Sequence, residues 1–288
     1  MERGAGNTGL VLHGSNGIFR VSLGGEVRTL RIRGKRLSVG EREYNPLCPG
    51  DEVRVVDDST IAERLPRRTV LSRFNRKRMA PQALAANVDL VVILGSPAEP
   101  AFRPRFLDRA LVLAAAAQLP ALLVLNKIDL LAEGNLDGTS AGDTENEARS
   151  YFGYLAAVGF STLVLSHKTG EGLDAVRQEL RGKRAVLLGQ SGVGKSTLIR
   201  TLGGAEAKTA AVSGRTQKGR HTTTTGRLYP EIGVVDTPGI RELSVYGVDR
   251  DAVDAAFPEI VRQARHCAHD NCSHVSEEGC AVRGYTST

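Results

Sequence analysis

The first 65 residues alternate apolar and polar positions in short runs, which is the pattern of half-buried β-strands. Glycine, asparagine and proline residues separate the runs and supply turns. Four or five short strands within about 60 residues are typical of a small closed barrel such as an OB-fold, and we assign residues 1–66 to one. The predicted strands are Gly9–His13, Gly17–Leu23, Val27–Arg33, Glu52–Val56 and Ile61–Leu65.

In the second part of the chain, continuous apolar runs of strand length alternate with stretches of helical periodicity, such as Arg105–Gln118. This alternation predicts an α/β domain over residues 85–245, with a parallel sheet and a ligand at the carboxyl ends of its strands. Residues 133–146 are polar and glycine-rich, so we predict a loop there. The predicted strands are Asp89–Leu94, Ala121–Leu125, Thr162–Leu165, Arg184–Leu188 and Ile232–Val235, and the further helices are Glu147–Val158, Leu173–Leu180 and Lys195–Leu202.

Between these two parts, residues 66–82 hold six Arg or Lys residues and no acidic residue. We interpret residues 67–84 as a basic linker, whose charge is explained equally well by contact with a nucleic-acid backbone or by a solvated loop. The barrel is also rich in arginine, and the net charge of the chain is +6, which allows a nucleic-acid partner without requiring one. We place RNA contact by the barrel ahead of a solvated basic face, although Phe19 and Tyr44 are its only aromatic residues.

No run approaches the roughly 18 uninterrupted apolar residues that suggest a membrane span. The first residues also lack the apolar core of a signal peptide. We therefore expect a cytoplasmic protein that does not enter a membrane, and we expect it to be a monomer.

A glycine-rich loop, G-Q-S-G-V-G-K-S-T, follows one of the predicted strands and precedes a predicted helix. It fits the phosphate-loop pattern G-x-x-x-x-G-K-[ST], in which glycines let consecutive backbone N–H groups point at phosphate oxygens. Its lysine would place a charge on the β- and γ-phosphates, and the serine hydroxyl would ligate Mg²⁺. A chance glycine-rich turn would not need the strand and the helix in this order. The loop comprises Gly189, Gln190, Ser191, Gly192, Val193, Gly194, Lys195, Ser196 and Thr197.

A second motif, N-K-I-D, indicates which base is bound. Its carboxylate, Asp129, can accept two hydrogen bonds from the N1–H and 2-amino edge of guanine, a donor pair that adenine lacks, so GTP is favoured over ATP. Alone the motif could be a strand-to-helix turn, but together with a phosphate loop it is specific. A further loop after the next strand suits a position behind the guanine. The residues concerned are Asn126, Lys127, Ile128 and Asp129 in the motif, and Ser166, His167 and Lys168 in the further loop.

Two more segments suit a γ-phosphate sensor. The D-T-P-G sequence supplies Asp236 for a Mg²⁺-linked carboxylate and Gly239 for an N–H that detects the γ-phosphate. Residues 205–226 lack clear periodicity, and we expect the first switch there; within it, residues 219–225 read G-R-H-T-T-T-T. A hydroxyl there would complete the Mg²⁺ shell, with Thr223 favoured and Thr222 close behind. A threonine-rich loop or the start of a strand is the alternative.

The order of the motifs is unusual, because N-K-x-D precedes the phosphate loop, whereas in most small GTPases it comes last. The order predicts a circularly permuted GTPase domain, since moving the chain ends does not move the site. One mechanical consequence follows. The segment after D-T-P-G, which moves when the γ-phosphate leaves, leads directly into the residues after 245 and could transmit the nucleotide state to them.

Three of the four cysteines cluster near the C-terminus, within a segment that we assign to a zinc-binding module, residues 246–288. The spacing C-x4-C-x-H-x5-C suits a closed tetrahedral shell of the structural type, which leaves no open position for catalysis. His266 and His269 are spare candidates for the histidine ligand, and a reduced cluster without metal is the alternative. Cys48 has no predicted role. The predicted zinc ligands are Cys267, Cys272, His274 and Cys280.

The chain closely resembles the ribosome small-subunit-dependent GTPases, the RsgA (YjeQ) family, over most of its length. The resemblance rests on the barrel, the A-A-N-V-D entry to the first α/β strand, the permuted motif order, G-R-H-T-T-T, D-T-P-G and the Cys/His cluster. It implies an OB-fold, a permuted GTPase domain and a zinc module, and it selects His274 as the zinc ligand. Family members usually continue past this cluster into a helical segment, whereas this sequence stops at Thr288, which weakens the expectation that the module docks on RNA.

The resemblance also implies the function: GTP is hydrolysed to GDP and phosphate, with stimulation by the small ribosomal subunit, during late maturation of that subunit and in contact with its rRNA. Ile240 occupies the position where Ras-like enzymes have a water-orienting glutamine, so intrinsic hydrolysis should be slow. The resemblance makes His221 the catalytic, water-orienting residue, and a merely structural His221 is the alternative.

A second class of function remains open, in which the chain is an RNA-binding clamp that changes conformation with the nucleotide and turns GTP over only incidentally. Acceleration of turnover by ribosomal subunits would separate the two classes. A permuted GTPase that acts on the large subunit is disfavoured by the barrel and the Cys/His cluster.

Overall fold

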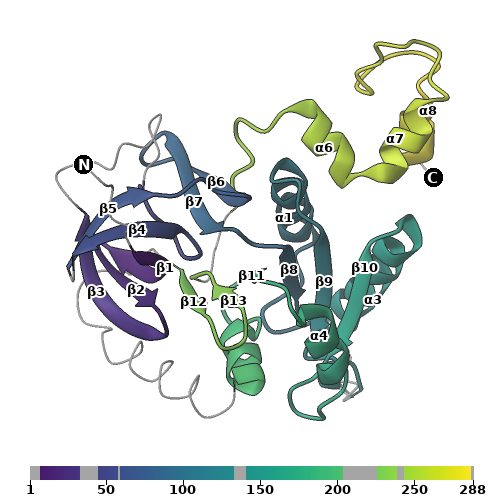
Figure 1. The fold of residues 1–288 in the computed structure, drawn as a ribbon. Helices are drawn as coiled ribbons and strands as arrows, with labels where there is room; N and C mark the ends of the chain where they lie inside the picture. The colour runs from purple at the N-terminus through teal and green to yellow at the C-terminus, as the bar shows by residue number, and fades with distance from the viewer. Residues whose placement is uncertain are drawn as a thin grey trace.

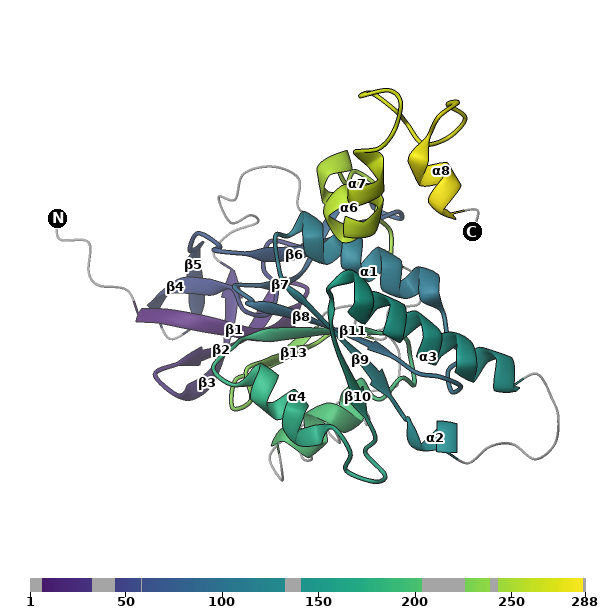
Figure 2. The same cartoon turned by 90° about the vertical axis from the view of Figure 1, so that its right-hand side faces the viewer.

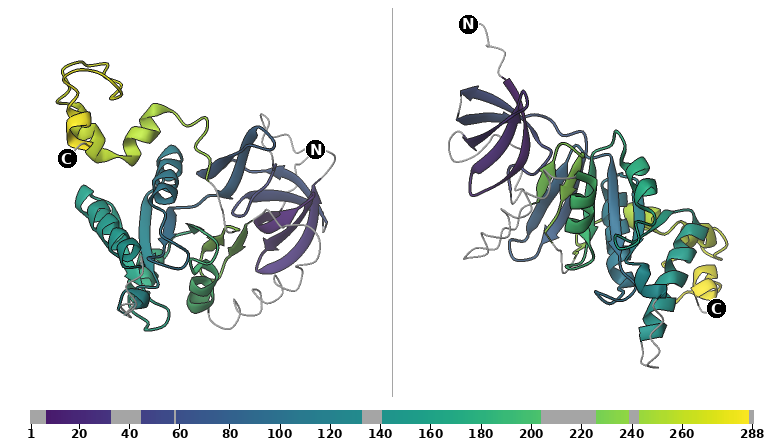
Figure 3. Two further views of the ribbon diagram at one scale, coloured as in Figure 1. Left: turned by 180° about the vertical axis from the view of Figure 1, so that it is seen from behind. Right: turned by 90° about the horizontal axis from the view of Figure 1, so that it is seen from below.

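The computed structural model describes residues 7–32, 45–57, 59–132, 141–203, 226–238 and 243–286. The N-terminal barrel and the C-terminal helices lie at opposite ends of the molecule, with a six-stranded sheet between them (Figures 1 and 3). His221, Thr222, Thr223, Gly239 and Ile240 lie outside the described residues.

The N-terminal strands close into the predicted five-stranded barrel, in the order β1-β2-β3-β5-β4. All neighbouring strands are antiparallel except β3 and β5, which pair in parallel. The sequence alternation arises because every second side chain enters the barrel, where Val21, Leu30 and Ile61 are fully buried. The strands are β1 Asn7–Ser15, β2 Ile18–Leu23, β3 Glu26–Ile32, β4 Glu52–Asp57 and β5 Thr60–Arg64.

The basic segment predicted as a linker contains a β-hairpin formed by β6 (Val70–Asn75) and β7 (Ala80–Ala86). The linker prediction missed it because β7, A-P-Q-A-L-A-A, lacks the β-branched and aromatic residues that mark strands. The hairpin forms through tertiary packing, since Leu71 and Ala85 are fully buried against the α/β domain.

A buried ion pair joins the barrel to the start of this hairpin. The Arg67 guanidinium donates to both carboxylate oxygens of Asp51, at 2.7 and 2.9 Å, and neither side chain is more than 7% exposed. Asn87 adds a hydrogen bond from its Nδ2 to the Gly50 carbonyl oxygen at 2.9 Å. Because a buried charge without its partner is costly, these contacts specify how the barrel sits on the α/β domain.

The central sheet has the strand order β10-β9-β8-β11-β13-β12. It is parallel, as predicted, except for β12, which pairs antiparallel with β13 because the chain turns directly from one to the other. Strand β12 was not predicted, because it has only three residues and follows a stretch without periodicity. The strands are β8 Leu90–Gly95, β9 Ala121–Asn126, β10 Ser161–Leu165, β11 Ala185–Gly189, β12 Arg227–Tyr229 and β13 Val234–Asp236.

Helices cover both faces of the sheet and bury two separate cores (Figure 2). Along β8, Val91 and Ile93 face α1 and α3, while Val92 and Leu94 face α4 and the helical residues 195–203. Burial on both faces explains why these strands are continuously apolar. The helices are α1 Pro104–Ala116, the single turn α2 Asp129–Ala132, α3 Ala141–Val158 and α4 Leu173–Leu180. Helix α3 begins within the segment that was predicted to be a loop.

Three short helices follow the sheet: α6 Arg250–Ala256, α7 Pro258–Ala264 and α8 Ala281–Thr286. Asp249 caps α6 by accepting a hydrogen bond from the Ala252 N–H at 2.8 Å. Within the described part of the chain, no helix is both long and apolar enough to cross a membrane.

Candidate functional site

The predicted phosphate loop leaves β11 at the carboxyl edge of the sheet and runs into the helical residues 195–203. Gly192 and Gly194 have φ values of 85° and 106°, a region that side chains rarely adopt. A Cβ added to Gly194 would lie only 2.1 Å from Nδ2 of Asn126. Glycine is therefore required here both by backbone conformation and by the close approach of the guanine-motif asparagine.

Lys195 is almost fully buried inside the curl of this loop, at 6% exposure. Its Nζ donates to the carbonyl oxygens of Gly189 and Gln190, at 2.7 and 3.0 Å. Burial lowers the pKa of the Lys195 ammonium from its usual value, while the nearby carboxylate of Asp236 acts in the opposite direction. The loop thus concentrates positive charge at its centre, which suits a phosphate group.

Asp236 ends β13 opposite Leu187 of β11, which places its carboxylate beside the phosphate loop. Its Oδ1 is buried and has no hydrogen-bond partner within the part of the chain that the structure describes. Burial raises the pKa of this carboxyl to about 6, although Lys195 opposes the shift. A buried carboxylate oxygen without a protein partner, together with the Ser196 hydroxyl on the same loop, is a donor set of the kind that Mg²⁺ prefers.

The guanine motif lies at the end of β9, next to the phosphate loop. Asn126 Nδ2 donates to the Val193 carbonyl oxygen at 2.8 Å, and Asn126 Oδ1 is buried without a partner among the residues described. Lys127 has a φ of 65°, and its Nζ donates to the Glu99 carbonyl oxygen. The structure thereby brings together two motifs that are more than 60 residues apart in sequence.

The loop after β10 lies beside the Asp129 carboxylate. Ser166 is fully buried, and its Oγ donates to Asp129 Oδ1 at 2.6 Å, which orients the carboxylate that the motif assigns to guanine. His167 packs against the helix after the phosphate loop, with Nδ1 3.5 Å from Thr201 Oγ1. Burial and then the charge of Arg200 lower the pKa of His167, against a smaller opposing effect of Asp129. Lys168 is exposed.

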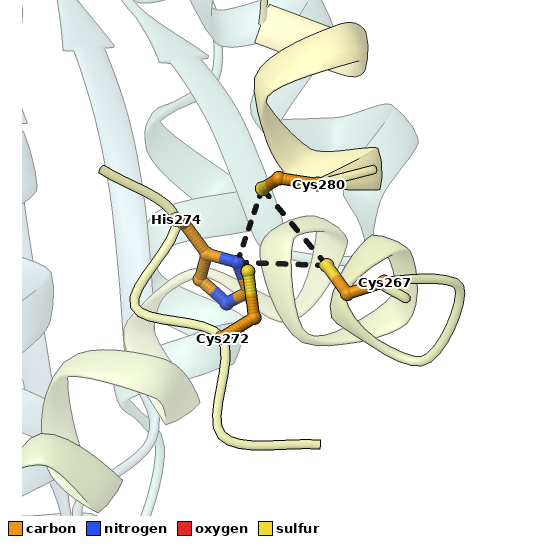
Figure 4. Close-up of side chains that lie close together, drawn as sticks. All are labelled: Cys267, Cys272, His274 and Cys280. Carbon is orange, nitrogen blue, oxygen red and sulfur yellow. Dashed lines mark hydrogen bonds between the residues drawn. The ribbon is translucent and has the colours of Figure 1, made fainter. Parts of the chain in front are cut away.

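The four predicted zinc ligands converge between α7 and α8 (Figure 4). Nδ1 of His274 lies 3.6 Å from Cys267 Sγ and 3.5 Å from Cys280 Sγ, and the two sulfurs are 4.0 Å apart. All four ligand atoms lie within 4.8 Å of one another. Zinc–ligand bonds of about 2.0–2.3 Å in a tetrahedron separate the ligand atoms by roughly 3.5–3.8 Å, so the cluster fits a zinc ion with little adjustment.

Backbone amides support the thiolates of this cluster. Burial raises the pKa of the Cys267 thiol, but the N–H groups of Val282 and Ala281 outweigh this effect, so the pKa lies below its usual value. Burial instead raises the pKa of Cys272 to about 11. Deprotonating all three cysteines this close together is opposed by their mutual repulsion, and a divalent cation removes that repulsion, which favours a bound metal.

Comparisons with known proteins agree with this geometry. The sequence profile described as RsgA GTPase matches residues 64–246, which is more than half of the chain. The chain belongs to the RsgA GTPase family. Among its relatives, the small ribosomal subunit biogenesis GTPase RsgA of Bacteroides fragilis is 33% identical over 285 residues, covering 96% of this chain and 89% of the relative. The RsgA of Chlorobaculum parvum is 38% identical over 257 residues, covering 85% and 78%.

Solved structures extend the similarity to the whole RsgA-type architecture. YjeQ from Thermotoga maritima matches with a TM-score of 0.68 at 26% identity, over 98% of this chain and 91% of that one. YloQ, described as a circularly permuted GTPase, matches with a TM-score of 0.64 at 23% identity, over 99% and 90%, and supports the fold. The predicted family and fold class are confirmed, and RsgA-family membership makes this chain a GTP hydrolase.

Three parts of this RsgA-type site were not predicted from sequence. The Glu99 carbonyl receives the Lys127 ammonium, Thr201 contacts His167, and the Thr237 hydroxyl donates to the Leu187 carbonyl oxygen at 2.5 Å. Thr237 belongs to the D-T-P-G motif, so its fixed position could have been suspected from the sequence. The other two contacts use a loop carbonyl and a helix surface that no motif marks.

Proposed function

We propose that this chain couples GTP hydrolysis to late maturation of the small ribosomal subunit, with turnover stimulated by that subunit. The observation that carries the proposal is the hydrogen bond from Asn126 to the Val193 carbonyl, because it joins the guanine motif and the phosphate loop in one site. The names of the relatives, small ribosomal subunit biogenesis GTPases, supply the cellular process. The chain would act in the cytoplasm, as a monomer, in contact with the small-subunit rRNA.

Each part of the site has a role in this proposal. Asp129, oriented by Ser166, accepts the guanine N1–H and 2-amino hydrogens. Asn126 braces the base-binding loop against the phosphate loop, and Lys127 ties it to the Glu99 carbonyl. The loop amides and Lys195 hold the phosphates and stabilise charge on the γ-phosphoryl group. Ser196 and Thr223 would hold Mg²⁺, with Asp236 as the linked carboxylate, and the ion would supply further positive charge to the phosphates. The backbone N–H of Gly239 would detect whether the γ-phosphate is present.

The first switch, the Cys/His cluster and the basic surfaces also have roles in this proposal. His221 would orient the attacking water once the partner orders the first switch, because Ile240 offers no hydrogen bond for that purpose. One structural Zn²⁺ would be held by Cys267, Cys272, His274 and Cys280. The arginine-rich barrel and the basic β6–β7 hairpin are the surfaces we assign to the phosphate backbone of rRNA.

The decisive experiment compares GTP turnover by the chain alone with turnover in the presence of small subunits, large subunits or free RNA. We expect a large increase, on the order of 10³-fold, with small subunits only, as when a GTPase site is completed by its partner. An unchanged rate with every partner would contradict the proposal and favour the nucleotide-dependent RNA clamp.

Replacing His221 with alanine is expected to lower subunit-stimulated turnover by on the order of 10²-fold or more, because water orientation and proton transfer contribute about that much. GDP binding should remain, which equilibrium titration with a fluorescent GDP analogue checks. The control is His266→Ala, since His266 is exposed and lies outside the Cys/His cluster. Equal stimulated rates for His221→Ala and the unsubstituted chain would assign His221 a structural role only.

Replacing Asp129 with asparagine is expected to weaken GTP binding by about 10²-fold or more, because the new amide presents N–H donors to the guanine 2-amino group. Xanthine carries a carbonyl oxygen at that position and should be bound in preference by the variant. Titration with GDP and XDP measures both effects. The exposed carboxylate Asp174 gives the control Asp174→Asn, which should change neither affinity. Retention of GTP preference by Asp129→Asn would remove Asp129 from the base site.

A further inference from the structure

One carboxylate organises the loop that carries the histidine of the Cys/His cluster. Oε1 of Glu277 accepts hydrogen bonds from the Ser273 N–H, at 2.7 Å, and from the Ser273 hydroxyl. Its Oε2 accepts from the N–H groups of Val275 and Ser276, both at 3.0 Å. The two carboxylate oxygens therefore bind the backbone on both sides of His274.

His274 needs such support because its φ is 62°, in the left-handed region that disfavours a residue with a Cβ atom. This backbone conformation carries the ring to the cluster, where Nδ1 lies 3.5–3.6 Å from the sulfurs of Cys280 and Cys267. The loop has no regular secondary structure between α7 and α8 that could impose the conformation instead. The carboxylate of Glu277 is the group that closes the turn.

The bonds to Glu277 are charge-assisted. The Ser273 hydroxyl, followed by the Ser273 N–H, holds the pKa of Glu277 well below its usual value, so the side chain is ionised at neutral pH. The main chain of the same residue is also tied to the cluster. Arg283 donates from Nη1 to the Glu277 carbonyl oxygen at 3.2 Å, and its backbone N–H lies 3.4 Å from Cys280 Sγ. Two cluster ligands are therefore linked through the segment around Glu277.

We propose that Glu277 is a positioning residue for the metal site: its carboxylate holds His274 in the backbone conformation that directs Nδ1 at the three cysteine sulfurs. This inference rests on the zinc site of the proposed function. Groups that orient a metal ligand commonly change metal affinity by about 10- to 100-fold, without touching the ion. Glutamine at position 277 would keep the shape of the side chain, but its amide group would face backbone N–H donors with a donor of its own.

The test uses the full chain, with Co²⁺ as a spectroscopic probe and Zn²⁺ measured in competition with a chromophoric chelator. We expect Glu277→Gln to weaken Zn²⁺ binding by about 10- to 100-fold and to alter the cobalt absorption bands as the histidine ligand loosens. Glu278→Gln is the matched control, because this neighbouring glutamate is exposed and makes no hydrogen bond among the described residues. It should leave both the spectrum and the affinity unchanged.

A double-mutant cycle with His274→Ala separates positioning from general stabilisation of the loop. If Glu277 acts through His274, Glu277→Gln should add little once the histidine is gone. Fully additive effects, or a Glu277→Gln variant with native affinity and spectrum, would overturn the inference. Ser273→Ala, which removes only one of the four hydrogen bonds, should show a smaller loss in the same direction and serves if Glu277→Gln does not fold. Failure of the unsubstituted chain to bind Co²⁺ or Zn²⁺ would overturn the zinc assignment itself.

Discussion

Replacing Lys195 with alanine is expected to lower GTP turnover by on the order of 10²- to 10³-fold, the largest effect of any single substitution in the site. The ammonium group is buried in the curl of the phosphate loop and is held there by two carbonyl oxygens, at 2.7 and 3.0 Å. No other described residue brings a cation to that position, so charge on the γ-phosphoryl group would lose its main side-chain partner. Phosphate release in the presence of small ribosomal subunits measures the loss.

A matched control for this substitution is Lys183→Ala. Lys183 lies in the same part of the chain but is partly exposed, and among the described residues its ammonium pairs only with Glu179, at 3.3 Å. It should retain full turnover. A Lys195→Ala variant that hydrolyses GTP at the native stimulated rate would show that the phosphate loop is not the catalytic site.

Replacing Cys272 with serine is expected to abolish stoichiometric zinc binding and to unfold the segment between α7 and α8. The apolar cluster there is small and consists mainly of the cysteines themselves with Val282, Ile260 and Ala264. Structural zinc contributes on the order of 10 kcal/mol to folding in comparable small sites, far more than this cluster can supply. Zinc content per chain and limited proteolysis after α7 measure the two effects.

The nucleotide site should be insensitive to that change, so GDP affinity should stay within about twofold of the native value, because the Cys/His cluster lies between α7 and α8, away from the phosphate loop. Cys48→Ala provides the control, because Cys48 is buried beside the barrel and far from the cluster in the chain. It should keep one zinc per chain. Native zinc content in Cys272→Ser would mean that the other three ligands suffice to hold the ion and that Cys272 is not required for the zinc site.

The sequence predicted the parts of this protein whose chemistry is local. The phosphate loop has a fixed spacing because Gly194 must adopt a positive φ and a Cβ at Gly189 would lie 2.7 Å from Val193 Cγ1, and the barrel strands alternate because every second side chain is buried. Strands β8 and β11, the second of which leads into the phosphate loop, are continuously apolar and could be recognised because both faces of the sheet are covered.

The features that were missed depend on contacts between distant segments. The β6–β7 hairpin is stabilised by the α/β domain against which Leu71 and Ala85 pack, and its own composition suggests a solvated linker. The Asp51–Arg67 ion pair joins residues that no motif connects. Glu277 resembles any acidic residue on a polar loop until the backbone is seen to wrap around its carboxylate. In each case the information lies in the tertiary structure rather than in a local pattern.

The strand order of the central sheet has a consequence for the time at which the protein becomes able to bind nucleotide during its synthesis. Strands β8, β9 and β10 are contiguous in sequence and form one half of the sheet, whereas β11, β12 and β13 form the other half. Because a chain is made from its N-terminus, the half that carries Asn126, Asp129 and Ser166 emerges first, and the phosphate loop and Asp236 emerge last. A partly synthesised chain therefore has the loops that we assign to the base but lacks the phosphate loop. We expect stable GTP binding only after β11 and β13 have been added, at the point where the sheet is complete.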